Sequence, residues 1–214
     1  MRVCFCGWVA VTKLNLDVAL KTELLMITQT RFLTLEEFLK LPETKPPSEY
    51  INGQVIPKPV PKTRHSRLQG KLIHKINEVV EAKQIAYGFP ELRCTFGERS
   101  IIPDIAVFRW ENIAIDETGE PLDQVIIPPN WTIEILSPDQ SSNRVIGNIL
   151  HCLQYGSELG WLIDPDDRSI LVFQRQQQPE LFQGNDQLVV LEGIDLDLTA
   201  EEVFNWLKMG TFPT

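Results

Sequence analysis

Two acidic residues, Asp104 and Glu134, stand within apolar and β-branched runs that predict short buried strands. Asp104 stands where the first run begins, and Glu134 lies in the middle of the second. Because a charged side chain is almost never fully buried without a partner, both need a cation, a hydrogen-bond network or exposure on an open sheet face. Carboxylates on neighbouring strands suit a hard divalent cation such as Mg²⁺. Ordinary strand acids that face water or an arginine would show the same pattern.

A second group that could do chemistry is a basic stripe on a predicted helix over residues 64–83. Leu68 and Leu72 begin a series of apolar residues at helical spacing, which predicts the buried face of this helix. The adjoining stripe is basic and consists of Arg64, Arg67, Lys71 and Lys75, with Lys58 and Lys62 just upstream. The stripe is either a solvated helix face or a surface that binds the phosphate backbone of a nucleic acid.

The composition of the 214 residues is that of a globular protein, with 43% hydrophobic and 23% charged residues. The formal net charge of -9 argues against a protein that coats nucleic acid without sequence preference, since such a protein needs a basic surface. No apolar run is long enough to span a bilayer, and no signal peptide is recognisable. The few cysteines are scattered and lack the spacing of a zinc site, so a cytoplasmic location is expected.

Residues 1–30 form an apolar and then mixed segment, which we interpret as a leader. Our hypothesis is that Met26 is the native start and that residues 1–25 come from an over-long gene prediction. Residues 31–214 are expected to form a single domain.

The remaining patterns predict helices and strands in a mixed order. Asn52 and the glycine after it predict a tight hairpin, because they adopt the positive φ that such turns need. The region 109–130 is long, polar and proline-containing, as lids and partner contacts often are. The predicted elements are a short helix after Thr34, a hairpin at Glu49–Ile56, the long helix, strands at Phe89–Phe96, Ile101–Phe108 and Trp131–Leu136, a helix up to Tyr155, a hairpin of Leu159–Ile163 and Ile170–Phe173, a strand at Leu188–Leu191 and a final helix capped by Thr199. This order indicates an α/β (α+β) fold, a mixed β-sheet flanked by helices.

Several motifs occur in one order along the chain. They are Glu49 at the hairpin, His65 opening the long helix, Pro103-Asp104, Glu134-Ile135-Leu136-Ser137-Pro138 and Trp161-Leu162-Ile163-Asp164-Pro165. Together they resemble the bacterial putative restriction endonuclease family, a branch of the PD-(D/E)XK nuclease superfamily, over about Leu33 to Leu207. The resemblance implies a restriction-endonuclease-like fold, hydrolysis of DNA phosphodiester bonds and a homodimer.

The resemblance also implies roles for individual residues. Asp104, Glu134 and Glu49 would bind one or two Mg²⁺ or Mn²⁺ ions against the scissile phosphate. Such an ion lowers the pKa of bound water and neutralises charge in the transition state. The DNA backbone would be bound by the basic stripe and by the histidine at the helix start, namely Arg64, His65, Arg67, Lys71 and Lys75.

The lysine that normally follows the second acid by two residues is missing, and the apolar Leu136 stands in its place. In the family resembled, a basic residue on the next helix often takes over. That helix carries Arg144, Asn148 and His151 on its polar stripe, and no lysine. We therefore expect Arg144 to stabilise phosphate charge, although a guanidinium cannot act as a base. We expect His151 to move a proton.

The missing lysine leaves two other functions open. One is a nuclease-fold module that has lost cleavage and only binds DNA or a protein partner. The other is a different hydrolase that uses its carboxylates directly as acid and base, as glycosidases do. Measurements of metal binding and of DNA cleavage distinguish these functions from an active nuclease.

Overall fold

The structure of the chain is a computed structural model, which describes residues 33–138 and 140–210. The predicted leader and the hypothetical start at Met26 lie outside the described residues. The helices and strands are α2 (Leu35–Leu39), β1 (Ser48–Ile51), β2 (Gln54–Pro57), α3 (Thr63–Val80), β3 (Ala86–Pro90), β4 (Cys94–Phe96), β5 (Arg99–Ile101), β6 (Ile105–Arg109), the 3₁₀ helix η1 (Trp110–Asn112), β7 (Trp131–Ile135), α4 (Ser142–Tyr155), β8 (Leu159–Asp164), β9 (Ser169–Gln174), β10 (Glu180–Gln183) and α5 (Ala200–Asn205). None of these described helices combines the length and the hydropathy that crossing a membrane requires.

The described strands form two sheets instead of the single sheet expected from the sequence. The smaller sheet has the strand order β2-β1-β5-β4 and is antiparallel. The larger sheet has the order β10-β9-β8-β7-β6-β3, in which β7 and β8 run parallel. Parallel neighbours need a crossover connection, and α4 supplies it. The predicted mixed sheet with flanking helices is confirmed, and the second sheet is an addition.

Two strands that were predicted as continuous are each divided between the sheets. The predicted strand Phe89–Phe96 becomes β3 and β4, and Ile101–Phe108 becomes β5 and β6. Glu91 has a φ of 47°, and Pro103 lacks the N–H that a strand ladder needs, so the chain leaves one sheet at each place. The prediction of continuous strands was wrong. As a result, Asp104 lies in the short link between the two sheets.

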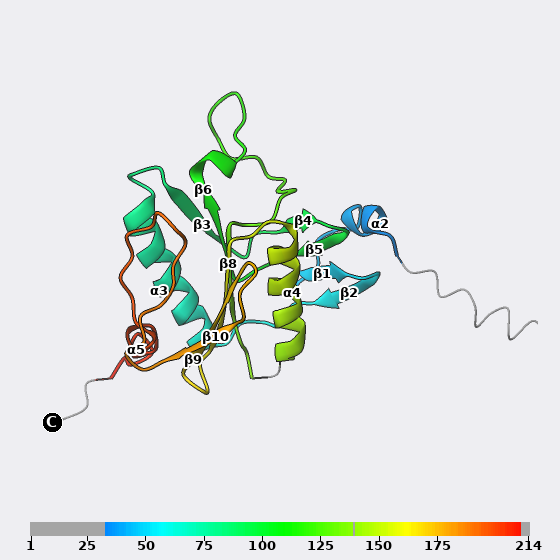
Figure 1. The fold of residues 1–214 in the computed structure, drawn as a ribbon. Helices are drawn as coiled ribbons and strands as arrows, with labels where there is room; N and C mark the ends of the chain where they lie inside the picture. Colours follow the sequence, from blue (N-terminus) through cyan, green and yellow to red (C-terminus); the bar gives the residue numbers. More distant parts are fainter. Residues whose placement is uncertain (1–32, 139, 211–214) are drawn as a thin grey trace, which may run out of the picture. The chain divides into compact units, whose positions relative to one another are not determined.

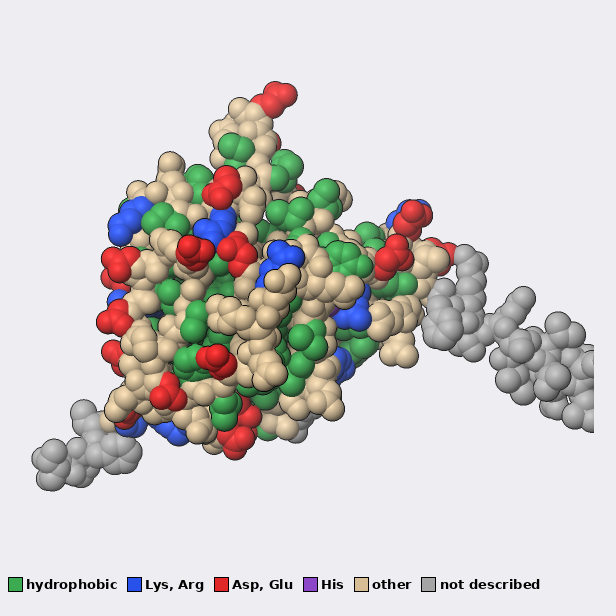
Figure 2. Space-filling model, in the orientation of Figure 1, with side chains coloured by type: hydrophobic (Ala, Val, Ile, Leu, Met, Phe, Trp, Pro, Cys, Tyr) green, Lys and Arg blue, Asp and Glu red, His purple; other side chains and the backbone are tan. Residues whose placement is uncertain are grey.

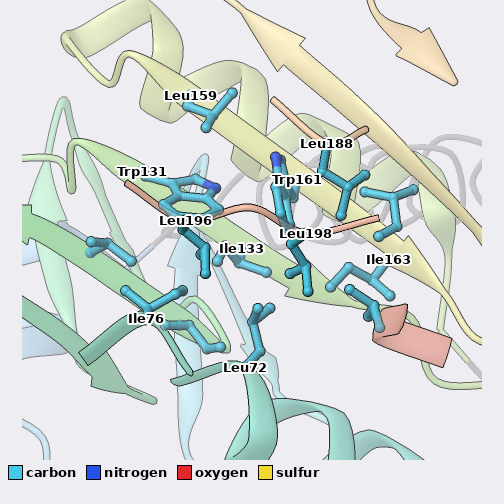
Figure 3. Close-up of a cluster of buried hydrophobic side chains, with 14 of the residues drawn as sticks. Leu72, Ile76, Trp131, Ile133, Leu159, Trp161, Ile163, Leu188, Leu196 and Leu198 are labelled. Atoms are coloured by element: carbon cyan, nitrogen blue, oxygen red, sulfur yellow. The ribbon is translucent and has the colours of Figure 1, made fainter. Parts of the chain in front are cut away.

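The larger sheet is covered on both faces. On one face α3 packs Leu72 and Ile76 against the strands, with α5 beside it. Trp131 and Trp161 are fully buried there and meet edge to face, with ring centroids 4.7 Å apart (Figure 3). On the other face α4 lies over the sheet (Figure 1). Its Ile149 packs with Leu162 of β8 and Phe173 of β9. Because successive strand residues alternate between faces, burial on both faces explains the apolar runs of these strands.

The C-terminal part differs from the prediction in two strands. Leu188 and Leu191 are buried, but their segment forms no strand in the described structure. It covers the sheet through contacts such as that of Trp161 Nε1, which donates to the Val189 carbonyl oxygen at 2.9 Å. β10 was not predicted, because its largely exposed residues lack apolar alternation. The capping box that begins α5 at Thr199 is confirmed.

Close packing between α4 and the larger sheet predicts that one added methyl group destabilises the protein. A Cβ atom at Gly160 would lie 2.3 Å from Ile149 Cγ2 and 3.4 Å from Thr132 Cγ2. We expect Gly160→Ala to lower the free energy of unfolding by about 1–3 kcal/mol, the usual cost of overpacking. Gly147→Ala in α4 is the control, because nothing lies within 4 Å of its added Cβ. Thermal unfolding measures both variants, and an unchanged Tm for Gly160→Ala would contradict the described packing.

Candidate active site

Three acids that are far apart in the sequence lie together with one lysine where the chain passes between the two sheets. Glu49 comes from β1, Asp104 from the link before β6, and Glu134 from β7. All three are buried, with exposed fractions of 7%, 2% and 3% respectively. We refer to them as the acid cluster. Lys58, which follows β2, interacts electrostatically with each of them.

Asp104 is held by donors from three elements. Its Oδ1 lies 2.7 Å from Lys58 Nζ, and its Oδ2 lies 2.9 Å from His65 Nε2. The same Oδ2 accepts a hydrogen bond of 2.7 Å from the backbone N–H of Ile135. Burial opposes ionisation, but Lys58 and His65 outweigh it, so the pKa of Asp104 lies below its ordinary value. The carboxylate is therefore ionised and fixed in orientation.

Lys58 is a site residue that the sequence analysis assigned to the protein surface. Its exposed fraction is only 9%, and Nζ donates to the Ile102 carbonyl oxygen at 2.5 Å besides contacting Asp104. Burial lowers the pKa of a lysine, but here the attraction of the acid cluster outweighs burial and raises the pKa of Lys58. A charged ammonium therefore lies beside the acids.

The β1–β2 hairpin explains how Lys58 arrives beside Glu49. Strand pairing places Pro57 opposite the start of β1, so the next residue emerges next to that strand. The Lys58 backbone N–H donates to the Pro47 carbonyl oxygen at 2.8 Å. The sequence signal was a lysine between two prolines, Pro57 and Pro59, directly after a hairpin that carries an acid. That signal is too weak to identify the residue alone.

Glu134 is a buried acid whose ionised form is not stabilised by its neighbours. In the described part of the chain it forms no ion pair. Burial and the negative charge of Asp104, with a smaller effect of Glu49, raise the pKa of Glu134 well above its ordinary value. Lys58 and the Asp104 backbone N–H offset only part of this increase. The uncharged form of Glu134 is therefore favoured in this structure, and a further cation at the site would favour its ionisation.

Glu49 is positioned by a backbone amide and by α4. Its Oε1 accepts a hydrogen bond of 2.9 Å from the Ile102 N–H, and both its carboxylate oxygens lie 3.4 Å from Asn148 Nδ2. Asn148 belongs to the polar stripe of α4 in which a substitute for the missing lysine was sought. Its Oδ1 is buried and has no hydrogen-bond partner among the described residues. An unused oxygen acceptor therefore remains on the residue that holds Glu49.

The two predicted catalytic residues of α4 do not contact the acid cluster. Arg144 is half-buried and, within the described structure, makes no ion pair with these acids. His151 Nε2 lies 3.1 Å from the Phe96 carbonyl oxygen, and its ring stacks on that of Phe96 with centroids 4.9 Å apart. The pKa of His151 is lowered, and burial of the imidazole is the largest cause. In the described structure, Lys58 and Asn148 contact the acid cluster, at Asp104 and Glu49 respectively.

His65 is separated from the basic stripe with which it was expected to bind DNA. It is buried against Asp104, whereas the stripe lies on the outer side of α3. Three stripe residues are engaged elsewhere, Arg64 with Asp166 at 2.5 Å, Arg67 with the Trp206 carbonyl oxygen and Lys75 with Glu78 at 3.2 Å. Lys71 is exposed and makes no such contact with the described residues. DNA binding by the stripe stays a prediction.

Two hollows of the described structure differ in whether a residue that contacts the acid cluster lines them. A cavity of about 220 Å³ adjoins His65 and is walled by the start of α3 and by the residues after β7, including Ser137. An apolar hollow of about 290 Å³ lies under the region 109–130, with Phe108 and Leu122 among its walls. Figure 2 shows hydrophobic side chains around the base of this protruding region. Of the two, only the first includes a residue that contacts the acid cluster.

Comparisons with known proteins point to one family. The model of the family Uma2, described as "Putative restriction endonuclease", matches residues 35–201, which include the acid cluster and Lys58. The chain is 50% identical to a putative nuclease belonging to DUF820 from Anabaena variabilis, whose crystal structure is known. That similarity covers 82% of this chain and 99% of the other, with a TM-score of 0.79. No curated protein matches the chain.

Proposed function

Since the chain belongs to the Uma2 family of putative restriction endonucleases, we propose that it is a metal-dependent endonuclease that hydrolyses phosphodiester bonds of DNA at the acid cluster. One observation carries this choice of site. The buried ammonium of Lys58 contacts the buried carboxylate of Asp104 and interacts electrostatically with the buried Glu49 and Glu134. Acids and one lysine are the groups that the superfamily resemblance calls for, although this lysine comes from another part of the chain.

Mg²⁺ or Mn²⁺ fits this site in donor chemistry and in charge. Hard divalent cations prefer oxygen ligands, and the site offers carboxylates, the Ile102 carbonyl and the unpartnered Oδ1 of Asn148. Glu49, Asp104 and Glu134 would hold the ion, which would acidify a bound water and neutralise phosphate charge. As the side chains stand, no group of three or more His, Cys, Asp or Glu residues in the described structure is arranged to hold a metal. Side chains must therefore move when an ion binds.

The residues of the chain itself supply charge and orientation. The Lys58 ammonium provides a preformed positive charge for phosphate oxygens, which become more negative in the transition state. His65 and the Ile135 N–H hold Asp104 in one orientation, as the outer partners of metal-ligating groups commonly do. Asn148 does the same for Glu49.

Plasmid cleavage tests the role of Lys58. With Mg²⁺ we expect the wild-type protein to nick supercoiled plasmid. Lys58→Met is expected to be slower by about 10²–10³-fold, the usual effect of removing one charge-stabilising donor. Lys40→Met, which removes an exposed lysine, is the matched control. Equal rates for Lys58→Met and the wild type would refute the role of Lys58, and a wild type that is inactive with both Mg²⁺ and Mn²⁺ would refute the nuclease proposal.

A second candidate is a nuclease-fold module that binds DNA or a protein partner without cleavage. The contact of 2.7 Å between Lys58 and Asp104 favours this candidate, because a buried acid that already has a cation partner can serve structure alone. Binding of DNA without nicking in any divalent cation would support it. A hydrolase that uses carboxylates alone is not proposed, since the family matched is one of nucleases. The homodimer and the cytoplasmic location stay predictions.

DNA binding is expected to depend on Lys71, the stripe residue without a partner among the described residues. Lys71→Ala should weaken binding to all duplex sequences alike and reduce the slope of log K against log salt by about 1. Arg67 is less suitable, because its loss would also remove the contact with the Trp206 carbonyl oxygen. Fluorescence anisotropy of a labelled duplex at several salt concentrations measures the slope, with Lys40→Ala as control. An unchanged slope would exclude Lys71 from the phosphate contacts.

A further inference from the structure

We propose that the Lys58 ammonium occupies the cation position of the acid cluster while no metal is bound, and that a divalent cation competes with it for Asp104 Oδ1. The inference rests on the proposed function, since it takes the acid cluster as a metal site. It gives Lys58 a role besides its contact with phosphate. The ammonium partly neutralises the buried acids until the ion enters.

The contacts of Lys58 are those of a cation in an oxygen-lined site. Nζ lies 2.7 Å from Asp104 Oδ1 and 2.5 Å from the Ile102 carbonyl oxygen. Both oxygens belong to the short link between β5 and β6. Carboxylate and carbonyl oxygens are also the ligands that hard divalent cations take. The ammonium and the metal ion therefore require the same atoms.

The charge of a divalent ion favours this exchange of ligands. Among the described residues, Lys58 and His65 both pair with Asp104, and neither Glu49 nor Glu134 has an ion-pair partner. A divalent cation together with the retained Lys58 would balance the three carboxylates, which must be ionised to bind it. Because Lys58 holds Asp104 Oδ1, the acids are engaged with the ammonium instead of arranged around a metal.

The exchange requires movement of the Lys58 side chain and not of its backbone. The backbone N–H is bonded to the Pro47 carbonyl oxygen, and prolines flank the residue on both sides. The side chain, in contrast, is a flexible four-carbon stem. Once it leaves Asp104, the ammonium becomes available to a phosphate oxygen. Binding of the ion thus frees the positive charge that the reaction uses.

The first test is the Mn²⁺ affinity of the full chain, measured by isothermal titration calorimetry. Lys58→Met is expected to bind Mn²⁺ at least about tenfold more tightly than the wild type, because repulsion between two neighbouring cations is removed. Methionine retains an unbranched apolar side chain without the charge. Lys40→Met is the control and should bind like the wild type. Equal or weaker binding by Lys58→Met, or no binding by either protein, would overturn the inference.

The second test uses the wild type, so that misfolding of a variant cannot obscure the result. Labelling of lysine amines with acetic anhydride, read by mass spectrometry of peptides, reports whether Lys58 is released from Asp104. Saturating Mg²⁺ should raise the labelling rate of Lys58 several-fold and leave that of the exposed Lys40 unchanged. A labelling rate of Lys58 that Mg²⁺ does not alter would overturn the inference.

The plasmid assay separates this inference from the proposed function. Tighter Mn²⁺ binding by Lys58→Met in a protein that never nicks DNA would refute the nuclease and retain the competition. Nicking by the wild type, together with equal Mn²⁺ affinities of the two proteins, would retain the nuclease and overturn the competition.

Discussion

Asp104→Asn is expected to reduce plasmid cleavage by about 10³-fold or more, beyond the usual cost of losing one hydrogen-bond donor at an active site. The carboxylate contacts Lys58, His65 and the Ile135 N–H, and it lies in the link between the two sheets. An asparagine has the same shape but cannot hold a divalent cation by charge. The proposed site would therefore lose both its metal affinity and the partner of its ammonium.

The same substitution is expected to destabilise the fold. Removal of one partner from a buried ion pair typically costs about 3–5 kcal/mol, because it leaves the Lys58 ammonium without its nearest counter-ion. Since the pKa of Asp104 is lowered in the folded protein, its ionisation stabilises the fold above its unfolded pKa. That stability is lost as pH falls through the folded pKa, so the difference between wild type and variant should shrink in acid.

Circular dichroism and urea unfolding show whether Asp104→Asn is folded under the assay conditions. Asp197→Asn is the matched control, because Asp197 is exposed and remote in sequence from the acid cluster. A folded Asp104→Asn variant that nicks plasmid as fast as the wild type would remove Asp104 from the active site.

Glu134→Gln is expected to abolish cleavage and yet to stabilise the metal-free protein. Burial and the neighbouring acids make the charged form of Glu134 unfavourable, as its raised pKa indicates. Glutamine has nearly the same shape and no charge. We expect a gain of roughly 1–3 kcal/mol at neutral pH, the range for poorly compensated buried polar groups. Each kcal/mol should raise Tm by about 2–4 °C.

The difference in stability between Glu134→Gln and the wild type is expected to depend on pH. A carboxyl whose folded pKa is raised costs stability as pH increases from its unfolded pKa to its folded pKa. The advantage of Glu134→Gln should therefore be absent in acid, appear as pH rises above the unfolded pKa and be complete at alkaline pH. Glu117→Gln, which changes an exposed acid of the region 109–130, is the control. A variant less stable than the wild type at neutral pH would mean that the Glu134 charge is already compensated.

Asp104→Asn is expected to lower stability and Glu134→Gln to raise it, while both abolish cleavage. This combination would distinguish an active site from an ordinary structural ion pair. The ionised form of Asp104 is stabilised by its partners, whereas the ionised form of Glu134 is made unfavourable by burial and by the neighbouring acids. Sites that bind cations commonly retain charge at a cost to stability. A purely structural cluster would gain nothing from the charge of Glu134.

Local signals in the sequence were sufficient for much of the fold. The Asn52 turn, the Gly156 end of α4 and the Thr199 cap are where they were predicted, because each depends on the conformational preference of one or two residues. The apolar neighbours of Asp104 and Glu134 predicted buried strands, and of the alternatives left open for the two acids the structure shows burial. The division of two strands was missed, because apolar alternation continues across the break and Glu91 does not by itself predict a positive φ.

Local sequence was sufficient to place most helices, most strands and the turns, since hydrophobic periodicity and turn chemistry act over a few neighbouring residues. It left open whether Asp104 and Glu134 are buried with a partner or face water. Tertiary structure alone decided which cation meets those acids. Lys58 contacts a carbonyl 44 residues further along the chain, and His65 contacts a carboxylate 39 residues away. Such contacts depend on how two sheets and α3 pack together, and a lysine on a solvated surface has the same local sequence pattern as a lysine buried in a site.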